Sequence, residues 1–347
     1  MTEFVGQNIL VSGGAGFVGS CLVRLLLSQG AEQIVIVDNL LSAERSNVVR
    51  DARVQFIEGS IADDAILGKI EDQFDFVFHL ATYHGNQSSI HDPLADHANN
   101  TLTTLKLYER IRGFKRLRKV VYSSAGCSVA EKTFGDATAT EETDLVSINQ
   151  DSPYSMSKLF GEFYSNYYFK QHRLPTVRAR FQNVYGPGEI LGAGRWRGTP
   201  ATVWRNVTPT FIYKSLKGES LPIENDGRAT RDFIFVDDVA EGLARCATRG
   251  TAGNAYNIAS GKETSILELA RTINTLTGNK APFTALPKRA WDNSGKRFGS
   301  TEKAARELEF RAHIDIDTGL RLTVEWTRTN IETIDAVIAK HQSHMQG

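Results

Sequence analysis

The glycine-rich sequence SGGAGFVGS near the N-terminus constrains the fold more than any other segment. Gly13, Gly16 and Gly19 follow an apolar run at 8–11 and open a helical pattern. This spacing allows a tight turn and close approach of a pyrophosphate to the backbone and to the helix N-terminus. Asp38 ends the next apolar run, 22 residues after Gly16, where a carboxylate can accept from ribose hydroxyls. The pattern predicts a Rossmann-type site, and the carboxylate favours NAD over NADP.

Short β-branched runs alternate with helical patterns through the first half of the chain. Strands are predicted at 8–11, 34–38, 54–58, 76–79, 119–123 and 176–181, and helices at 17–28, 94–111 and 153–172. This βαβ rhythm indicates a parallel sheet with helices on both faces. The expected fold is therefore α/β, a Rossmann-type doubly wound parallel sheet.

The rhythm breaks after Asn183, where glycine, proline and arginine dominate and no period persists. Helical patterns return at 208–217, 236–247 and 265–277, and the last of them opens with a capping box formed by Ser265 and Glu268. These changes predict a NAD-binding domain at 1–182. They also predict a smaller, mixed substrate-binding region at 183–347 that partly interleaves with the first domain.

The overall charge and the cysteine content exclude several classes of function. Forty basic and forty acidic residues in 347 give a pI near 7.1, so no global field attracts nucleic acid or an anionic membrane. No apolar run has the length of a membrane span, and the first residues show no secretory signal. Cys21, Cys127 and Cys246 are too few and too scattered for a disulfide framework or a zinc site. We expect a cytoplasmic protein without a metal.

Tyr154 and Lys158 lie four residues apart at the start of a predicted helix, in SPYSMSKLFGEFY, and so share one helix face. An unperturbed phenol titrates near pH 10, roughly three units too high for a base at neutral pH, but a neighbouring ammonium lowers its pKa. Such a pair can take a proton from a substrate hydroxyl while hydride leaves the same carbon for a nicotinamide. Alone, this spacing is usually ordinary helix surface; the glycine turn upstream gives it a catalytic interpretation.

The ordered motifs of the chain resemble the extended short-chain dehydrogenase/reductase family, and within it the NAD-dependent sugar-nucleotide epimerases and dehydratases. GGAGFVGS, VDNL, VFHLAT, HDPLADHANN, YSSAG, SPYSMSK, RFQNVYGPG, ATRDFIFVDDVA and AYNIASG follow family order over nearly the whole chain. The resemblance implies a tightly held NAD that takes hydride from C4 of a nucleotide-linked sugar, leaving a 4-keto intermediate. It also implies Tyr154 as the base, and Lys158 as its tuner and nicotinamide-ribose ligand.

The resemblance further implies which residues line the cofactor pocket. These are Gly13, Gly16, Phe17, Val18, Asp38, Asn39, Ser60, Ile61, Leu80, Ala81, Thr82, Asn99 and Ser123, together with Tyr154 and Lys158. Ser88 or Ser89 also matches a pocket position, although a capped turn or helix explains these serines equally well. Ser60 departs from the family, which often has an acid there. This departure weakens the adenine contact, while the case for NAD rests on Asp38.

Residues of the second half resemble family positions that hold the substrate. Asn183 and Arg231 match positions that bind the nucleotide diphosphate, and Arg289 is the leading candidate to reach the nucleotide. Arg195 and Arg205 lie in RWRGTPATVWRN, where arginine and tryptophan residues can bind a base, a phosphate or the carboxylate of a uronate sugar. Solvated surface explains any single arginine as well. His79 and His84, near the end of the fourth strand, are expected to be structural or pocket-lining.

Three reactions share the 4-keto intermediate: epimerisation at C4, dehydration, and decarboxylation of a uronate. Family dehydratases usually carry an Asp-Glu pair, and decarboxylases a Glu, in the turn after the fifth strand. Here SSAGCSVA contains no carboxylate before Glu131. The sequence therefore favours a 4-epimerase acting on a UDP-hexose or UDP-uronate, with a dehydratase or decarboxylase as the alternative. A non-catalytic NAD(P)-binding regulator is a second alternative, against which the intact Tyr154 and Lys158 argue.

The same turn supplies candidates for a hydroxyl that assists proton transfer to the tyrosine. The Val-Tyr-Gly found in many family members is missing, so Ala125 or Gly126 would occupy the position where a hydroxyl is expected. Ser124 is the first candidate, followed by Cys127 and Ser128. Cys127 is better explained as a small pocket-lining residue, because this chemistry forms no covalent sugar adduct. A homodimer through helices of the first domain is common among relatives and is expected here.

Overall fold

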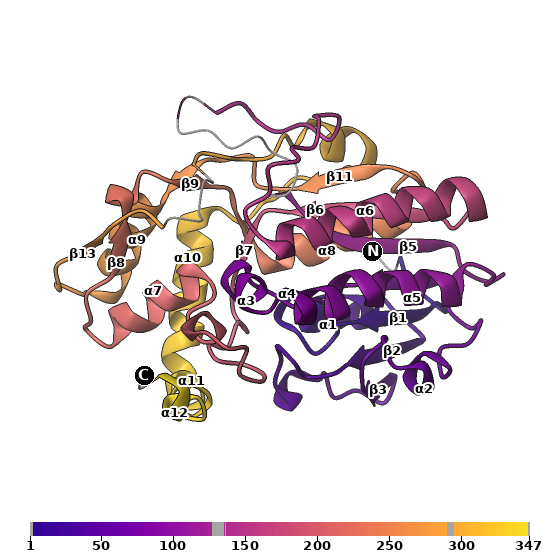
Figure 1. The fold of residues 1–347 in the computed structure, drawn as a ribbon, viewed down its shortest axis with the longest axis horizontal. Coiled ribbons are helices and arrows are strands. Elements are labelled where there is room, and N and C mark those ends of the chain that lie inside the picture. The colour runs from indigo at the N-terminus through magenta and orange to yellow at the C-terminus, as the bar shows by residue number, and fades with distance from the viewer. Residues whose placement is uncertain (1–2, 127–134, 136, 290–294, 346–347) are drawn as a thin grey trace.

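The structure is a computed structural model, and it describes residues 3–126, 135, 137–289 and 295–345. Its described residues form a seven-stranded parallel sheet in the order β11-β6-β5-β4-β1-β2-β3 (Figure 1). The strands are β1 (Asn8–Ser12), β2 (Gln33–Asp38), β3 (Val54–Glu58), β4 (Phe76–His79), β5 (Lys119–Ala125), β6 (Thr176–Phe181) and β11 (Ala255–Ile258). All these strands are parallel, so the loops at their carboxyl ends meet along one edge of the sheet.

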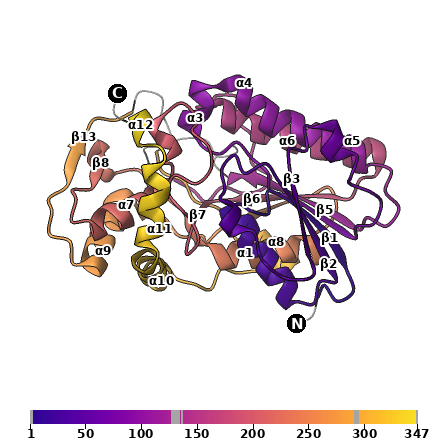
Figure 2. The same ribbon diagram turned by 90° about the horizontal axis from the view of Figure 1, so that it is seen from below.

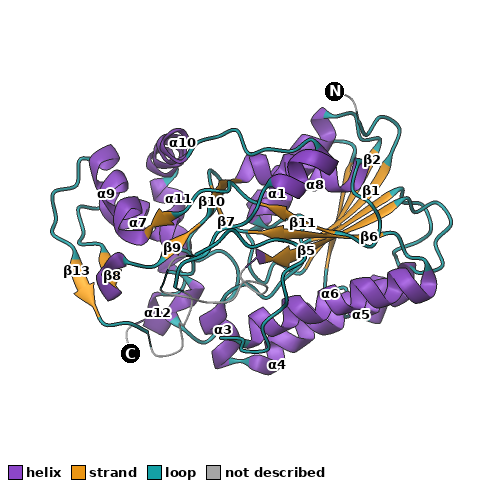
Figure 3. Ribbon diagram, turned by 90° about the horizontal axis from the view of Figure 1, so that it is seen from above, coloured by secondary structure: helices purple, strands orange, loops and turns teal. Residues whose placement is uncertain are grey.

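Helices cover both faces of this sheet. Figures 2 and 3 show α1 (Phe17–Ser28) and α8 (Val236–Thr248) on one face, and α5 (Leu102–Ile111) and α6 (Pro153–His172) on the other. Side chains of β1 alternate between the two layers, because Ile9 and Val11 belong to the core under α1 and α8, whereas Leu10 belongs to the core under α5. The predicted doubly wound α/β fold is therefore confirmed.

The helix predicted at 94–111 is interrupted by a wider turn. α4 (Pro93–Asp96) passes into a π-helical turn (His97–Thr101) before α5 begins. The Asn100 side chain ties this turn to its surroundings: its carbonyl oxygen accepts from the Tyr83 N–H (2.6 Å), and its amide donates to the Asp96 carboxylate (2.7 Å). The hydrophobic period cannot reveal such a turn, because it depends on contacts with a distant loop.

The second part is a smaller, mixed region beside the carboxyl edge of the sheet (Figure 1). Its helices are α7 (Val207–Leu216), α9 (Ile266–Thr277), α10 (Ile316–Thr329), α11 (Ile331–Ala339) and α12 (Gln342–Met345). Its short strands pair as β7 (Asn183–Tyr185) with β10 (Phe233–Phe235), β8 (Pro222–Glu224) with β13 (Thr284–Leu286), and β9 (Thr230–Arg231) with β12 (Thr264–Ser265). An apolar core that includes Phe211, Leu269 and Leu320 joins α7, α9 and α10. The Ser265 hydroxyl caps α9 by accepting from the Glu268 N–H, as predicted.

The two parts of the chain are interleaved at the sheet. β11, which follows α8, pairs with β6, so the segment 236–258 of the second part adds a strand and a helix to the first. Two further short helices, α2 (Asp64–Leu67) and α3 (Asn86–His91), follow β3 and β4. β11 escaped prediction because it is only four residues long and includes an asparagine. The division at residue 183 stays a prediction.

Candidate active site

A cavity of about 750 Å³ lies between the carboxyl edge of the sheet and the second part of the chain. Apart from Ser88 and Ser89, the residues predicted to line the cofactor pocket all line this cavity: Gly13, Gly16, Phe17, Val18, Asp38, Asn39, Ser60, Ile61, Leu80, Ala81, Thr82, Asn99, Ser123, Tyr154 and Lys158. The predicted substrate residues His84, Asn183, Arg205, Arg231 and Arg289 line the same cavity. The fold therefore brings both predicted groups together, although they are far apart in sequence.

The glycine turn between β1 and α1 leaves room for a pyrophosphate. Gly13 has a φ of +80°, and a Cβ on it would lie 2.5 Å from the Ala81 nitrogen. A Cβ on Gly19 would lie 2.1 Å from the Gly13 carbonyl oxygen, so any side chain there would push α1 off the turn. No side chain caps the N-terminus of α1 at Gly16. The first N–H groups of the helix are thus available to an anion, and the site fits the diphosphate of NAD.

Asp38 ends β2 and faces both the glycine turn and the cavity. Its carboxylate accepts hydrogen bonds from the Ala15 N–H (3.0 Å) and the Leu40 N–H (2.9 Å). Burial raises the pKa of Asp38, and the backbone donors oppose this rise. The residue therefore braces the glycine turn in addition to its predicted contact with the ribose hydroxyls.

Tyr154 and Lys158 occupy the first turns of α6, which begins at Pro153 after the capping residue Ser152. The Lys158 ammonium donates to the Ser123 carbonyl oxygen at the end of β5 (3.0 Å) and lies 5.7 Å from the centre of the Tyr154 ring. The Tyr154 N–H donates to the Ser89 hydroxyl on α3 (3.1 Å). These contacts fix the start of α6 against the sheet edge, with both side chains at the cavity. Ser88 and Ser89 themselves are buried beside the cavity and do not line it.

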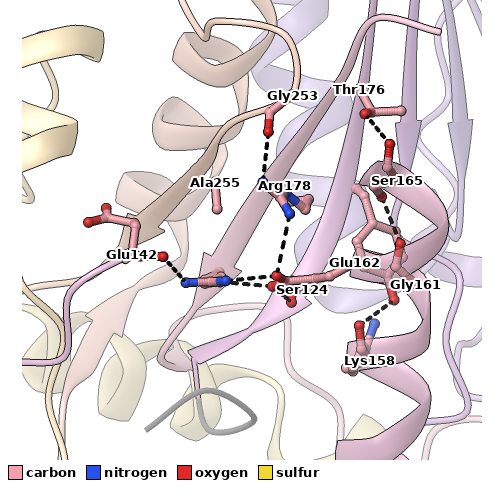
Figure 4. Close-up of polar contacts among 12 residues, drawn as sticks. Ser124, Glu142, Lys158, Gly161, Glu162, Ser165, Thr176, Arg178, Gly253 and Ala255 are labelled. Atoms are coloured by element: carbon pink, nitrogen blue, oxygen red, sulfur yellow. Dashed lines mark hydrogen bonds and ion pairs between the residues drawn. The ribbon is translucent and has the colours of Figure 1, made fainter. Parts of the chain in front are cut away.

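The Ser124 hydroxyl points into a buried polar network under the sheet edge (Figure 4). It donates to Glu162 Oε1 (2.5 Å), and the guanidinium of Arg180 donates to both carboxylate oxygens of Glu162 (2.8 Å each). Burial raises the pKa of Glu162, but Arg180 more than offsets this, so the carboxylate stays ionised. Ser124 also lines the cavity, and its assisting role stays a prediction. Cys127 and Ser128 lie outside the described residues.

His84 places a neutral ring next to the tyrosine. The two ring centres are 5.8 Å apart in an edge-to-face arrangement. Burial lowers the pKa of His84 to about 3, and the charges of Arg205, Arg197 and Lys158 act in the same direction. His79 is structural instead, since its ring bonds to the Ser12 and Thr104 hydroxyls (2.7 and 3.0 Å) inside the core.

Among the predicted substrate arginines, Arg231 is the most firmly held. Its guanidinium donates to the carbonyl oxygens of Thr230 and Gly295, each at 2.7 Å. Arg289 forms an ion pair with Glu224 at 2.6 Å. Arg195 is the exception, because it does not line the cavity and its exposed guanidinium donates to the Asn39 carbonyl oxygen (3.3 Å). Its own backbone N–H is bonded to the Leu41 carbonyl oxygen (3.0 Å), which keeps this side chain outside.

Several cavity residues were not predicted. Polar and charged examples are Ser42, Glu189, Asn206, Lys214, Glu224 and Arg297, all but Ser42 from the second part. Glu189 is 4% exposed, and burial raises its pKa. The only sequence signal for this group was the richness in glycine and arginine after Asn183, which does not say which side chains point inward.

No cluster of three or more His, Cys, Asp or Glu side chains that could hold a metal ion occurs among the described residues. No helix within the described ranges has both the length and the apolar character needed to cross a membrane.

Comparisons with known proteins agree with this geometry. Residues 9–259 match the model of the NAD dependent epimerase/dehydratase family. UDP-glucose 4-epimerase of Mycolicibacterium smegmatis is 32% identical over 93% of this chain and 99% of its own length. dTDP-glucose 4,6-dehydratase of Neisseria gonorrhoeae is 28% identical over 93% of this chain and 96% of its own. The crystal structure of the Bordetella bronchiseptica enzyme WbmF in complex with NAD+ and UDP has a TM-score of 0.90 and 66% identity, covering 99% of each chain.

The chain belongs to the NAD dependent epimerase/dehydratase family, because the family model covers most of its length and the relatives span nearly all of it. The family, the enzyme class and the NAD cofactor predicted from the sequence are thereby confirmed. The residues at the cavity fit that cofactor through the glycine turn, Asp38, and the pair Tyr154 and Lys158.

Proposed function

We propose that this protein interconverts the C4 epimers of a UDP-linked sugar. The observation that carries the proposal is the position of Tyr154. It lies next to Lys158 and lines the same cavity as the glycine turn and as Asn183, Arg231 and Arg289. A base in this position can reach a sugar whose nucleotide is held by the second part. NAD, when bound, would accept the hydride of C4 and return it to either face of the resulting ketone.

The residues of the chain divide the remaining work. Tyr154 takes the proton of the C4 hydroxyl and later returns it to the same oxygen, so the reaction is redox-neutral overall. The Lys158 ammonium stabilises the phenolate form through its charge, and the Ser123 carbonyl holds that ammonium in place (3.0 Å). His84 stays neutral beside the tyrosine and adds no competing charge.

The carboxylates at the cavity support epimerisation over dehydration. The end of β5 and the one described residue that follows it, residues 123–126, contain none. Among the described lining residues the carboxylates are Asp38, Glu189 and Glu224. Asp38 braces the glycine turn, and Glu224 is paired with Arg289. This leaves Glu189 as the one candidate acid, and a dehydratase of this family would use two.

The proposal is tested by incubating the purified protein with UDP-, GDP- and dTDP-linked sugars, neutral and acidic, and identifying the products by NMR. We expect a C4 epimer from a UDP-sugar and no net change in the NAD pool. A 4-keto-6-deoxy product would establish dehydration, and a pentose would establish decarboxylation. Bound NAD that no sugar nucleotide reduces would favour the regulator.

We propose further that the protein forms a homodimer through α6. Met156, Phe160, Phe163 and Tyr167 form a stripe on this helix at helical spacing, each between 43% and 55% exposed. Apolar residues concentrated on one face of a long helix are typical of an interface. Light scattering after gel filtration should give twice the chain mass of 38.4 kDa. Phe163→Glu should give the monomer, and a monomeric wild-type protein would refute the dimer.

A cytoplasmic location is proposed on the basis of the cysteines. Cys21 and Cys246, the described ones, are both free and buried, which suits a reducing compartment. Fractionation of cells that express the tagged protein tests this location, and recovery in the membrane or secreted fraction would contradict it.

A further inference from the structure

The segment 186–206, here called the strap, lies across the loops of the cofactor half. A Cβ on Gly188 would lie 3.9 Å from the Phe17 ring, at the start of α1. The Gly194 N–H donates to the Glu44 carboxylate (2.8 Å), in the loop after β2. The Arg197 guanidinium donates to the His84 carbonyl oxygen (2.9 Å), in the loop after β4. The strap therefore contacts two of the loops that surround the expected position of the cofactor, and it passes near the start of α1.

Two arginines of the strap, the buried Arg197 and the half-buried Arg205, converge on Ser42. Arg197 donates to the Ser42 hydroxyl (2.7 Å), and Arg205 donates to the Ser42 carbonyl oxygen (3.3 Å) and to the Ile190 carbonyl oxygen (3.4 Å). Arg197 is 4% exposed, and its Nε and Nη2 have no hydrogen-bond partner within the part of the chain that the structure describes. Among the described residues, neither guanidinium lies within ion-pair distance of a carboxylate. Burial lowers the pKa of both arginines, to about 9 for Arg197, and the charge of Arg205 adds to this effect.

Two acids lie near this pair, but neither is bonded to it directly. Glu44 is ion-paired with Lys340 and also accepts from the strap backbone. Glu189 is bonded to the Asn206 amide, and its other carboxylate oxygen has no hydrogen-bond partner among the described residues. The charges of Glu189 and Glu44 oppose the lowering of the pKa of Arg205 without cancelling it. A cation without a directly bonded carboxylate is costly to bury, and a bound anion reduces that cost.

The described lining of the opposite wall of the cavity has a single cationic side chain. Among the described lining residues of the first part, Lys158 is the one lysine or arginine, and it is held at the end of β5. His84 is neutral. The glycine turn can give a diphosphate only backbone N–H groups and a helix terminus. Arg205 lines the cavity next to Ser42, in the loop that directly follows Asp38.

We propose that Arg205 binds the diphosphate of NAD from the side opposite the glycine turn, and that Arg197 positions it by holding Ser42 and the loop at His84. The strap thereby retains the cofactor during turnover. This assignment differs from the prediction that Arg205 binds the substrate. It depends on the NAD cofactor and is independent of which reaction the enzyme catalyses.

The test measures NAD and UDP binding separately. Wild type, Arg205→Met, Arg205→Lys and Arg197→Met are stripped of nucleotide and titrated with NAD and with UDP by calorimetry, and NAD retained after exhaustive buffer exchange is quantified by chromatography. We expect Arg205→Met to weaken NAD binding by roughly 10- to 100-fold, the value of a charge-assisted contact, with UDP affinity within about twofold of wild type. The NAD affinity of Arg205→Lys should lie between those of wild type and Arg205→Met. Arg197→Met should weaken NAD binding less than Arg205→Met does.

Arg228→Met serves as the control, because this arginine lies outside the cavity and its side chain is 75% exposed. It should retain NAD as the wild type does. Circular dichroism without nucleotide checks folding, and if Arg205→Met does not fold, Arg205→Gln replaces it under the same criteria. Unchanged NAD binding, or a loss of UDP binding equal to or greater than the loss of NAD binding, would overturn the proposal.

Discussion

The wall of the cavity that comes from the sheet is made of strand ends and helix starts, whereas the opposite wall is made largely of the strap and short strands. In the first wall, Asp38 and Tyr154 are placed by regular elements with backbone hydrogen bonds of their own. In the second wall, the strap is held by glycines in left-handed conformations, such as Gly194 with a φ of +89°, and by buried arginines. The regular wall can supply the catalytic residues common to a family, while the irregular wall can determine how tightly the cofactor is held and which substrate is recognised.

The largest effect on turnover is expected from a substitution in the regular wall. Tyr154→Phe removes the base, so kcat should fall roughly 10²- to 10⁴-fold while NAD stays bound, because the glycine turn and Asp38 are untouched. Steady-state kinetics and the NAD content of the purified variant check both parts. Tyr167→Phe, which alters an exposed tyrosine of the same helix, is the control and should keep near-wild-type turnover. Undiminished turnover in Tyr154→Phe would end this mechanism.

The next effect concerns the network that ties α6 to the sheet edge. Arg180→Met leaves the Glu162 carboxylate buried without its bidentate partner, so the free energy of unfolding should fall by about 3–5 kcal/mol. Urea denaturation of both proteins measures it. Arg178→Met is the matched control, because Arg178 lies 4.0 Å from the same carboxylate. Its substitution should lower the free energy of unfolding by less than Arg180→Met does. If the two variants lost the same free energy of unfolding, the bidentate contact of Arg180 would not be what stabilises Glu162.

A smaller effect on stability is expected from pH, through a buried histidine of the sheet that lies behind the regular wall. Burial lowers the pKa of His79 to about 3, below the value of about 6.5 expected for an unfolded chain. The unfolded state therefore binds the proton first, and stability is lost as the pH falls below about 6.5. Between pH 7 and 5 this one group should cost about 2 kcal/mol. Urea denaturation at both pH values should show a smaller pH-dependent loss in His79→Gln than in wild type; an equal loss would contradict the assignment.

The smallest effect is expected at the outer surface of the strap. Arg195→Ala should change turnover of neutral and acidic sugar nucleotides by less than about twofold, because its guanidinium is exposed and lies outside the cavity wall. Kinetics with one UDP-hexose and one UDP-uronate measure this. A selective loss with the uronate would restore Arg195 as a ligand of the sugar carboxylate and would weaken the distinction between the two sides of the strap.

The difference between the walls also decides how much could be predicted from sequence. Strand and helix periods, together with the spacing of Gly13, Gly16 and Gly19, predicted the sheet and the cofactor loops to within one or two residues at most element ends. Local patterns carry this information, because each element packs one face on the sheet. The strap has no period, so the inward direction of Arg205 and the outward direction of Arg195 depend on contacts with loops about 150 residues earlier in the chain.

The π-helical turn at His97–Thr101 acts on α5 like a one-residue insertion. The wider turn takes up one residue more than an α-helical turn, so the apolar face of α5 keeps its place against the sheet. Within this turn Asn99 lines the cavity, and Asn100 holds the loop at Tyr83. Deleting either asparagine should therefore return the turn to ordinary α-helix while α5 stays packed on the sheet, which makes this turn a place where the cofactor pocket can change without repacking the core.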